Sequence, residues 1–392
     1  MCFLPADLHL TCTFTVVYFV DGPLTSSREA GGESPLNPHQ HRLTELRPRR
    51  VARPACLLCV EARGRRCPRL AGRSEDARSM DAIPVVDFGE YKLREDEDDD
   101  VPGERLQELR EEVRRAFTEV GFVYLRNTGI EQDEVDHIMA VSKKFFMLKE
   151  EEKRPYSRGS YSNSVNHGWV SLERESLNPQ RPGDLKEAFN TTSLREDIAW
   201  PSEEFRTTLV FFYKRCIRLA LRVLRVMALS LGIDPDVFLK AHEQIGSEEN
   251  GSTLRTLYYP PLKSKIVKED QIRCGEHADY GSITLLFQSK EEGLQVKSRK
   301  GEFISAPSIP GTVLINIADL MQRWTSDVFV SSVHRVLLPP VGDSHKERQS
   351  MTFFVQPDDN VMISCCDGSN KYPPVKCVDY LQSRFNDTYG KT

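Results

Sequence analysis

The chain has 392 residues, a length that accommodates one large domain or two of ordinary size. Hydrophobic residues make up 39% of the sequence and charged residues 28%, which is the composition of a globular protein with a buried core. The formal net charge is only −5, so the composition gives no indication of a nucleic-acid or polyanion partner. No apolar run approaches the roughly 18 residues that a membrane-spanning helix requires.

Residues 1–79 differ in composition from the rest of the chain. They contain arginine but no lysine, are rich in proline and glycine, and show little periodicity, whereas lysine is common from Met80 onward. We therefore predict a disordered extension over 1–79, with Met80 as the functional start. Cys56 and Cys59 form a CxxC pair, but without a second pair at zinc-finger spacing they do not indicate a zinc site.

The segment from Ile83 to Gly232 is predicted to be mainly helical. Short strands are expected at 83–88 and 121–125, and apolar residues at helical spacing predict helices over 106–120 and 135–145. A long helix should begin near Ser202 and end at Gly232, a residue suited to a helix C-cap. The apolar stripe of this helix is expected to cover one face of a sheet. It consists of Leu209, Phe212, Cys216, Leu219, Val223 and Met227.

After about residue 252, short β-rich runs alternate with glycine- and proline-containing turns. Strands are expected at 253–259, 282–287, 294–296, 312–317, 331–338 and 349–356. Regularly spaced strands of this kind are typical of a sandwich or barrel. Helices followed by antiparallel strands predict an α+β fold, with a double-stranded β-helix (jelly-roll) core backed by helices. The expected organisation is the 1–79 extension, a helical N-terminal region at 80–245 and a jelly-roll core at 246–392.

His277 and Asp279 stand two residues apart, just before a predicted strand. In an extended segment their side chains would share a face, although an HxD pair alone is commonly structural. His334, in a strand-like segment, offers a third ligand. Two imidazoles and one carboxylate on one side of an iron ion leave three positions open, which is the arrangement of non-haem Fe(II) oxygenases. A zinc hydrolase uses the same ligand types, but zinc gives no reason for the anion site described next.

Arg348 and Ser350 are also two residues apart in a predicted strand. A guanidinium directed into a barrel is unfavourable unless it binds an anion. A carboxylate fits the arginine fork, and the serine hydroxyl adds another hydrogen bond. A surface arginine at the start of a strand is the alternative. Beside the predicted metal ligands, a cosubstrate that carries a carboxylate explains the pair better.

Taken together, these motifs resemble the isopenicillin N synthase-like Fe(II)/2-oxoglutarate-dependent dioxygenases. The resemblance runs from about Ile83 to Tyr389. Its segments are Ile83-Pro-Val-Val-Asp87, Gly121-Phe-Val-Tyr124, Gly183-Asp-Leu-Lys-Glu-Ala-Phe189, Tyr258-Tyr-Pro-Pro261, His277-Ala-Asp-Tyr-Gly-Ser282, Gln322-Arg-Trp-Thr325, Val333-His-Arg335 and Arg348-Gln-Ser350.

The resemblance assigns a role to each candidate site residue. His277, Asp279 and His334 would bind Fe(II). Arg348 and Ser350 would hold the distal carboxylate of 2-oxoglutarate. That cosubstrate would also receive a hydrogen bond from the last residue of the run 253–259, Tyr259.

The implied activity is oxidation, by default hydroxylation, of a small organic molecule. O2 and 2-oxoglutarate would be consumed and succinate and CO2 released, with ascorbate as a candidate reductant. Two alternatives remain open at this point. One is an oxidase of the isopenicillin N synthase type that does not use 2-oxoglutarate, and the other is a non-catalytic jelly-roll binding protein.

Four residues are candidates for the substrate pocket: His167, Trp169, Phe189 and Phe354. Trp169 and Phe189 also suit the hydrophobic core, and His167 also suits a surface loop. The sequence contains no basic stripe interleaved with aromatic residues, so we expect a small-molecule substrate and not a nucleic acid or membrane partner. We also expect a monomer.

The cysteines indicate the compartment. Of the ten, the five from Cys216 onward have no framework spacing and lie in a chain long enough to bury a core. Free thiols in a reducing compartment are the simplest interpretation, and this predicts a cytoplasmic protein. The apolar segment Phe14–Val20 is short and lacks a preceding basic flank, so it does not predict a signal peptide.

Overall fold

A computed structural model of the chain describes residues 82–94, 103–159, 166–178, 180–194, 198–262 and 267–389. Contacts between residues divide the chain into two units, Met1–Ser74 and Glu75–Thr392, and every described residue belongs to the second. The predictions made for 1–79, including the CxxC pair, therefore lie outside the described residues.

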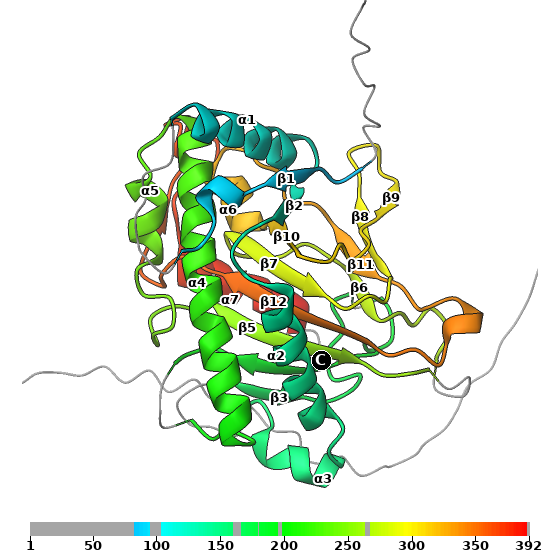
Figure 1. Ribbon diagram of the computed structural model, residues 1–392. Helices are drawn as coiled ribbons and strands as arrows, with labels where there is room; N and C mark the ends of the chain where they lie inside the picture. Colours follow the sequence, from blue (N-terminus) through cyan, green and yellow to red (C-terminus); the bar gives the residue numbers. More distant parts are fainter. Residues whose placement is uncertain are drawn as a thin grey trace, which may run out of the picture. The chain divides into compact units, whose positions relative to one another are not determined.

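The main sheet draws strands from both halves of the second unit. It has eight strands in the order β1-β2-β10-β7-β12-β5-β4-β3 (Figure 1). Their bounds are β1 Val85–Asp87, β2 Phe122–Arg126, β3 Gly168–Val170, β4 Glu187–Thr191, β5 Thr253–Tyr259, β7 Ile283–Gln288, β10 Thr312–Ile317 and β12 Arg348–Val355. The predicted boundary at 245/246 therefore falls inside one compact unit whose two parts share a sheet.

A smaller sheet completes the jelly-roll core. Its strands follow the order β6-β11-β8-β9, and β13 pairs with β14 in a separate ribbon. The bounds are β6 Cys274–His277, β8 Leu294–Lys297, β9 Phe303–Ser305, β11 His334–Val336, β13 Met362–Ile363 and β14 Val375–Lys376. The α+β jelly-roll prediction is confirmed.

The helices of the described residues are α1 Gly103–Glu119, α2 Gln132–Phe146, α3 Glu150–Lys153, α4 Glu203–Leu231, α5 Asp236–Leu239, α6 Asp319–Trp324 and α7 Cys377–Tyr389. Of these, α1, α2 and α4 contact strands of the main sheet. The longest, α4, contacts α1, α2, β7 and β12, and Figure 1 shows it running across the strands beside α2. None of the described helices combines the length and hydrophobicity that a bilayer crossing demands.

The ends of α4 are set by its sequence. Ser202 Oγ accepts a hydrogen bond from the backbone N–H of Phe205 at 3.1 Å, which is an N-cap. Gly232 ends the helix with φ of 74°, a conformation that favours glycine. Both predicted ends are confirmed.

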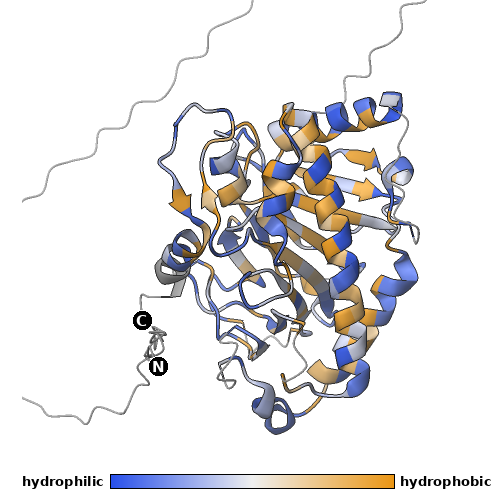
Figure 2. Ribbon diagram, turned by 90° about the vertical axis from the view of Figure 1, so that its left-hand side faces the viewer, coloured by the Kyte–Doolittle hydropathy of each residue, from blue (hydrophilic) through white to orange (hydrophobic). Residues whose placement is uncertain are grey.

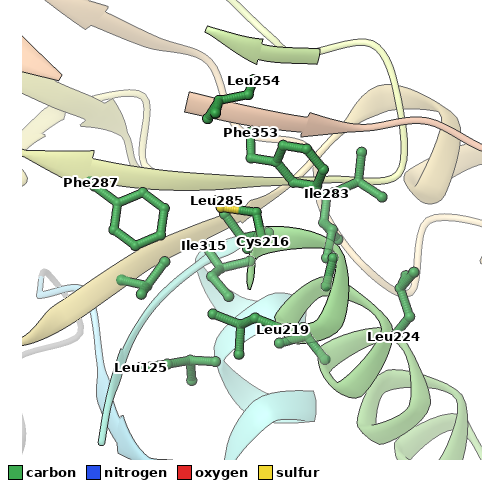
Figure 3. Packing of buried hydrophobic residues seen from close by; sticks show 14 of the residues in the cluster. Leu125, Cys216, Leu219, Leu224, Leu254, Ile283, Leu285, Phe287, Ile315 and Phe353 are labelled. Atoms are coloured by element: carbon green, nitrogen blue, oxygen red, sulfur yellow. The ribbon is translucent and has the colours of Figure 1, made fainter. Parts of the chain in front are cut away.

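The predicted stripe of α4 is buried against the sheet. All six of its residues are 0–1% exposed. Figure 2 shows the apolar face of the helix turned toward the strands. In Figure 3, Cys216 and Leu219 lie among Ile283, Leu285 and Phe353 of β7 and β12. Because strand side chains alternate between faces, these residues fix which side of each strand faces the helices and which faces the interior of the jelly roll.

Candidate active site

Two histidines face each other across neighbouring strands. β6 and β11 are antiparallel, and His277 is the direct register partner of His334. Nδ1 of His277 lies 2.8 Å from the carbonyl oxygen of Gly275, and Nδ1 of His334 lies 3.2 Å from that of Ser332. Since a carbonyl oxygen only accepts, each Nδ1 carries the proton. The lone pair of each Nε2 is then free to bind a metal.

Asp279 lies in the loop after β6, so strand alternation does not set the direction of its side chain relative to His277. Its Oδ2 accepts hydrogen bonds from Thr284 Oγ1 at 2.7 Å and from Asn316 Nδ2 at 2.8 Å. The other oxygen, Oδ1, lies 3.6 Å from Nε2 of His277 and 3.7 Å from Nε2 of His334. One carboxylate oxygen is thus fixed by the protein, and the other is presented to the histidines.

These three side chains can hold a metal ion. One ligand atom from each lies within 4.8 Å of the others, and all three residues are buried or half-buried. Burial and then the neighbouring imidazole of His334 lower the pKa of His277. Burial opposes ionisation of Asp279, but the histidines and its hydrogen bonds outweigh this and lower its pKa. Neutral imidazoles and a charged carboxylate are the forms that bind metal, and this donor set suits Fe(II) with three open positions.

Arg348 begins β12 and is almost fully buried. Nη2 of its guanidinium donates to Gln288 Oε1 at 2.7 Å, and Nη1 donates to Ser350 Oγ at 3.4 Å. The guanidinium lies over the ring of Tyr259, its register partner on β5, at 4.8 Å from the ring centroid. It forms no ion pair with a carboxylate in the described ranges. A buried cation of this kind favours binding of an anionic ligand.

A second buried arginine lies on the same side of the jelly roll. Arg273, just before β6, is 1% exposed and sits 5.8 Å from the ring centroid of Tyr259. Burial, followed by the positive charge of Arg348, lowers its pKa to about 10. Its Nη2 donates to the carbonyl oxygen of Lys346 at 2.9 Å. Arg273 and Arg348 together make this end of the core positive.

The two residues flanking Arg348 attach the strand to α2. Glu347 forms an ion pair with Lys143 of α2 and accepts a hydrogen bond from Tyr258 Oη at 2.8 Å. On the other side, Gln349 Nε2 donates to the carbonyl oxygen of Met139 at 2.9 Å. The start of β12 is therefore held against this helix on both sides of the buried arginine.

One cavity joins the metal ligands to Arg348 and Ser350. Tyr259 and Phe354 also line it, as do two residues not singled out from the sequence, Lys186 and Arg255. The candidate metal ligands and the buried arginine therefore face the same space, which is what a metal-bound cosubstrate anchored by its far end would require.

Only Phe354 of the four pocket candidates lines this cavity. His167 is fully buried and packs edge-on against Phe189 and Trp200, with ring centroids 5.4 and 5.1 Å apart. Phe189 is likewise in the core, and Trp169 Nε1 donates to Glu187 Oε2 at 2.8 Å. These three residues belong to the outer layer under the helices, because their side chains face away from the jelly-roll interior.

Several residues around the site escaped the sequence analysis. Gln288 positions Arg348, while Thr284 and Asn316 position Asp279. A signal was present for the last two. Each lies in a predicted strand where its neighbours on both sides are apolar core residues, so strand alternation directs it to the opposite, interior face.

Comparisons with known proteins match both halves of the described region. Residues 83–207 match the family described as "non-haem dioxygenase in morphine synthesis N-terminal", and residues 250–357 match the "2OG-Fe(II) oxygenase superfamily". The second match contains the three candidate metal ligands as well as Arg348 and Ser350.

Individual relatives agree with these matches. A UPF0676 protein of Schizosaccharomyces pombe is 35% identical over 282 residues, covering 69% of this chain and 85% of that protein. The 2-oxoglutarate-dependent dioxygenase gloF of Glarea lozoyensis is 30% identical over 303 residues, covering 69% of this chain and 90% of its own. Among solved structures, a full-length Neurospora crassa protein in complex with alpha-KG and thymine is 33% identical. That match covers 80% of this chain and 98% of the Neurospora chain, with a TM-score of 0.67.

Proposed function

Since the chain belongs to the 2OG-Fe(II) oxygenase superfamily, we propose that it hydroxylates a small organic molecule at an Fe(II) ion bound by His277, Asp279 and His334. The observation that carries this proposal is the convergence of two Nε2 atoms and one carboxylate oxygen at the cavity that also contains Arg348.

The enzyme is a 2-oxoglutarate- and Fe(II)-dependent dioxygenase. The family and its relatives thus favour this function over the oxidase that does not use 2-oxoglutarate and over the binding protein. When bound, the iron couples O2 and 2-oxoglutarate to C–H oxidation, so that R–H, O2 and 2-oxoglutarate become R–OH, succinate and CO2.

The protein's own contribution begins with the orientation of the ligands. Thr284 and Asn316 hold Oδ2 of Asp279, so Oδ1 is the oxygen directed to the metal. The backbone carbonyls of Gly275 and Ser332 hold the histidine rings in the tautomer that exposes Nε2. Such outer contacts fix ring direction and ligand basicity before metal arrives.

Arg348, Ser350 and Tyr259 would receive the distal carboxylate of 2-oxoglutarate. The guanidinium offers a planar fork, Ser350 offers a hydroxyl, and the ring of Tyr259 limits how far the fork can tilt. Arg273 adds positive potential behind the same ring. An anchored carboxylate fixes the distance of the keto acid from the metal and limits its rotation.

We extend the proposal to the setting of the enzyme. Thymine in the Neurospora relative supports a substrate of about one ring in size. Cys216, Cys274, Cys365, Cys366 and Cys377 are free thiols, which supports a reducing, cytoplasmic compartment. We propose a monomer acting on a small molecule and not on nucleic acid. Light scattering and cell fractionation test the oligomeric state and the compartment.

Succinate release tests the central proposal. Purified enzyme with Fe(II), 2-oxoglutarate and ascorbate should convert 2-oxoglutarate to succinate, and a small-molecule extract should accelerate this and yield products heavier by one oxygen atom. Chelation of iron should stop both reactions. Product formation that proceeds without 2-oxoglutarate, or succinate release that is indifferent to iron, contradicts the proposal.

A further inference from the structure

The cavity carries a second pair of cationic side chains, apart from Arg348. Lys186, just before β4, and Arg255, on β5, both line it, and their side chains are only 3% and 12% exposed. Neither has a role in holding the metal or 2-oxoglutarate in the function proposed above. Buried cationic groups that face a ligand cavity need a reason, because moving a charge out of water is costly.

The register of the main sheet separates Arg255 from the cosubstrate anchor. Tyr259 of β5 pairs with Arg348, and Arg255 pairs with Thr352 on one side and Asn190 on the other. Arg255, Leu257 and Tyr259 all point to the interior face of β5. The Cα atom of Arg255 therefore lies about 13 Å along the strand from that of Tyr259. The interior thus has one cationic position for the cosubstrate and another beyond it.

Two acidic residues form ion pairs with Lys186 and Arg255. Glu175 accepts a hydrogen bond from Arg255, lies 3.9 Å from Nζ of Lys186, and also pairs with Arg158 at 3.2 Å. Asp184 pairs with Lys186 and accepts from the backbone N–H of Gly275 at 3.0 Å. In the part of the chain that the structure describes, these two carboxylates are thus in contact with Arg158, Lys186 and Arg255.

Both acids remain outside the cavity wall. Burial opposes the charge on Glu175, but Arg255, Lys186 and Arg158 lower its pKa to about 2. Burial also opposes the charge on Lys186, and its neighbours, including Asp184 and Glu175, nevertheless raise its pKa. The side that a ligand meets consequently consists of charged N–H donors.

Apolar side chains also line this cavity, alongside polar ones such as Thr352, the register partner of Arg255. The apolar ones include Phe122, Leu177, Leu257, Leu286 and Phe354. A ligand there gains from burying a hydrocarbon or ring surface and from directing oxygen atoms toward the cationic pair. An ammonium or other N–H donor directed at Lys186 and Arg255 would instead be repelled.

We infer that the primary substrate presents an oxygen acceptor, either a carboxylate or a ring carbonyl, to Lys186 and Arg255, with its hydrocarbon part against Phe354 and Leu257. The inference rests on the proposed function and specifies its substrate class. Lys186 and Arg255 determine how the molecule is oriented, while the metal and 2-oxoglutarate sites determine what is done to it.

A matched series of one-ring compounds tests the inference. Benzoate supplies a carboxylate, uracil and benzamide supply neutral carbonyls, and benzylamine and toluene supply no acceptor oxygen. The readout is acceleration of succinate release by the full-length enzyme with Fe(II), 2-oxoglutarate and ascorbate. Acceleration by an acceptor compound, and not by benzylamine or toluene, supports the inference. Whether benzoate or the neutral carbonyl compounds accelerate the reaction shows if a carboxylate or a carbonyl is recognised. Acceleration confined to the last two compounds, or no acceleration by any acceptor up to its solubility limit, overturns it.

Variants then locate the recognition. Arg255→Leu should raise the half-saturating concentration of the accelerating compound by about 10- to 100-fold, the loss expected for a charged hydrogen bond, while Arg255→Lys recovers part of it. The double variant K186M/D184N removes the lysine without leaving its acid unpaired and should act in the same direction. Half-saturation by 2-oxoglutarate should change much less. Lys240→Met removes an exposed ion pair with Asp236 and serves as the control.

The outcomes separate the two proposals. Iron-dependent succinate release with no effect of Arg255→Leu or K186M/D184N on half-saturation by the accelerating compound contradicts the inference and leaves the proposed function standing. An enzyme that forms no succinate, even with a small-molecule extract, contradicts the proposed function and the inference with it. A thermal melt of each variant shows whether a loss reflects unfolding.

Discussion

Strand β12 presents chemically opposite faces to the two sides of the main sheet. Arg348, Ser350 and Thr352 line the cavity, whereas Met351 and Phe353 are buried in the core under α4. Strands β5, β7 and β10 of the same sheet follow the same alternation, with core residues facing the helices and Tyr259, Thr284 and Asn316 facing inward. Each strand therefore carries two independent sets of requirements, one for stability and one for chemistry. Substitutions on the helix-facing side should consequently change mainly stability, and substitutions on the interior side should change mainly activity.

The largest expected effect lies on the interior side. His334→Ala removes one of the three proposed metal ligands, so we predict that turnover falls by more than about 100-fold and that purified protein loses its iron. Succinate formation and iron content measure this, and the melting temperature of the metal-free protein should change little. His345→Ala, at an exposed histidine, is the control. Retention of iron and turnover by His334→Ala would mean that the metal is held elsewhere.

The next effect tests the outer face. Phe353 is fully buried and packs edge-on against Tyr213 of α4 at a centroid separation of 5.0 Å. Phe353→Ala should lower the free energy of unfolding by about 3–5 kcal/mol because it leaves a cavity. Half-saturation by 2-oxoglutarate should stay constant. Phe354→Ala is the matched control one residue away, and it should disturb substrate use more than denaturant stability. A loss of substrate use in Phe353→Ala, together with a loss of stability in Phe354→Ala, would contradict the assignment of separate roles to the two faces.

The cosubstrate anchor gives a graded effect on the interior face. Arg348→Ala should raise the half-saturating concentration of 2-oxoglutarate by about 10- to 100-fold, because charge-assisted hydrogen bonds are lost. Iron should still bind. Arg348→Lys keeps the charge without the fork and should fall between parent and alanine variant. Unchanged 2-oxoglutarate dependence in both variants would exclude Arg348 as the anchor.

The smallest expected effect comes from His167, which packs against Phe189 and Trp200 in the outer layer under the helices. Burial lowers the pKa of His167 from 6.5 to about 4. Between these values the unfolded chain binds more protons, so the stability contribution of the neutral ring is complete above pH 6.5 and is lost as pH falls toward 4. Through this group the parent should lose about 2 kcal/mol of unfolding free energy between about pH 7.5 and pH 5.

His167→Phe should abolish this part of the pH dependence. Urea unfolding of parent and variant at both pH values measures the difference directly. An equal pH dependence in the two proteins would mean that His167 is accessible to protons in the folded state. Activity measured at pH 7.5 should change little, because the ring lies away from the cavity.

The contrast between faces also explains what could be predicted from the sequence. The long helix and its ends followed from an apolar stripe, Ser202 and Gly232, all of them local signals. The strands at 253–259 and 312–317 matched their predicted bounds because alternation and turns marked them. By contrast, β6 has the sequence Cys-Gly-Glu-His, which contains no β-branched residue. It is a strand because it pairs with β11, and this pairing could not be predicted from the local sequence.

The site was harder to predict where side-chain direction depends on tertiary pairing. His277, Asp279, His334 and Arg348 could be proposed from the sequence because their residue types and order are specific. The pocket candidates were chosen as aromatic residues near the motifs, which does not reveal the face they occupy. Lys186 and Arg255 were missed because buried charges resemble surface charges until Glu175 and Asp184 are brought beside them.

Glu347 and Gln349 attach both sides of Arg348, the proposed cosubstrate anchor, to α2. Lys143 and the backbone of Met139 hold the first residues of β12, so a displacement of α2 is transmitted to the guanidinium between them without any contact with the ligand. The affinity for 2-oxoglutarate should therefore depend on the position of α2. Lys143→Met removes the ion pair with Glu347, so a substitution near the surface should change the affinity of the interior site for 2-oxoglutarate.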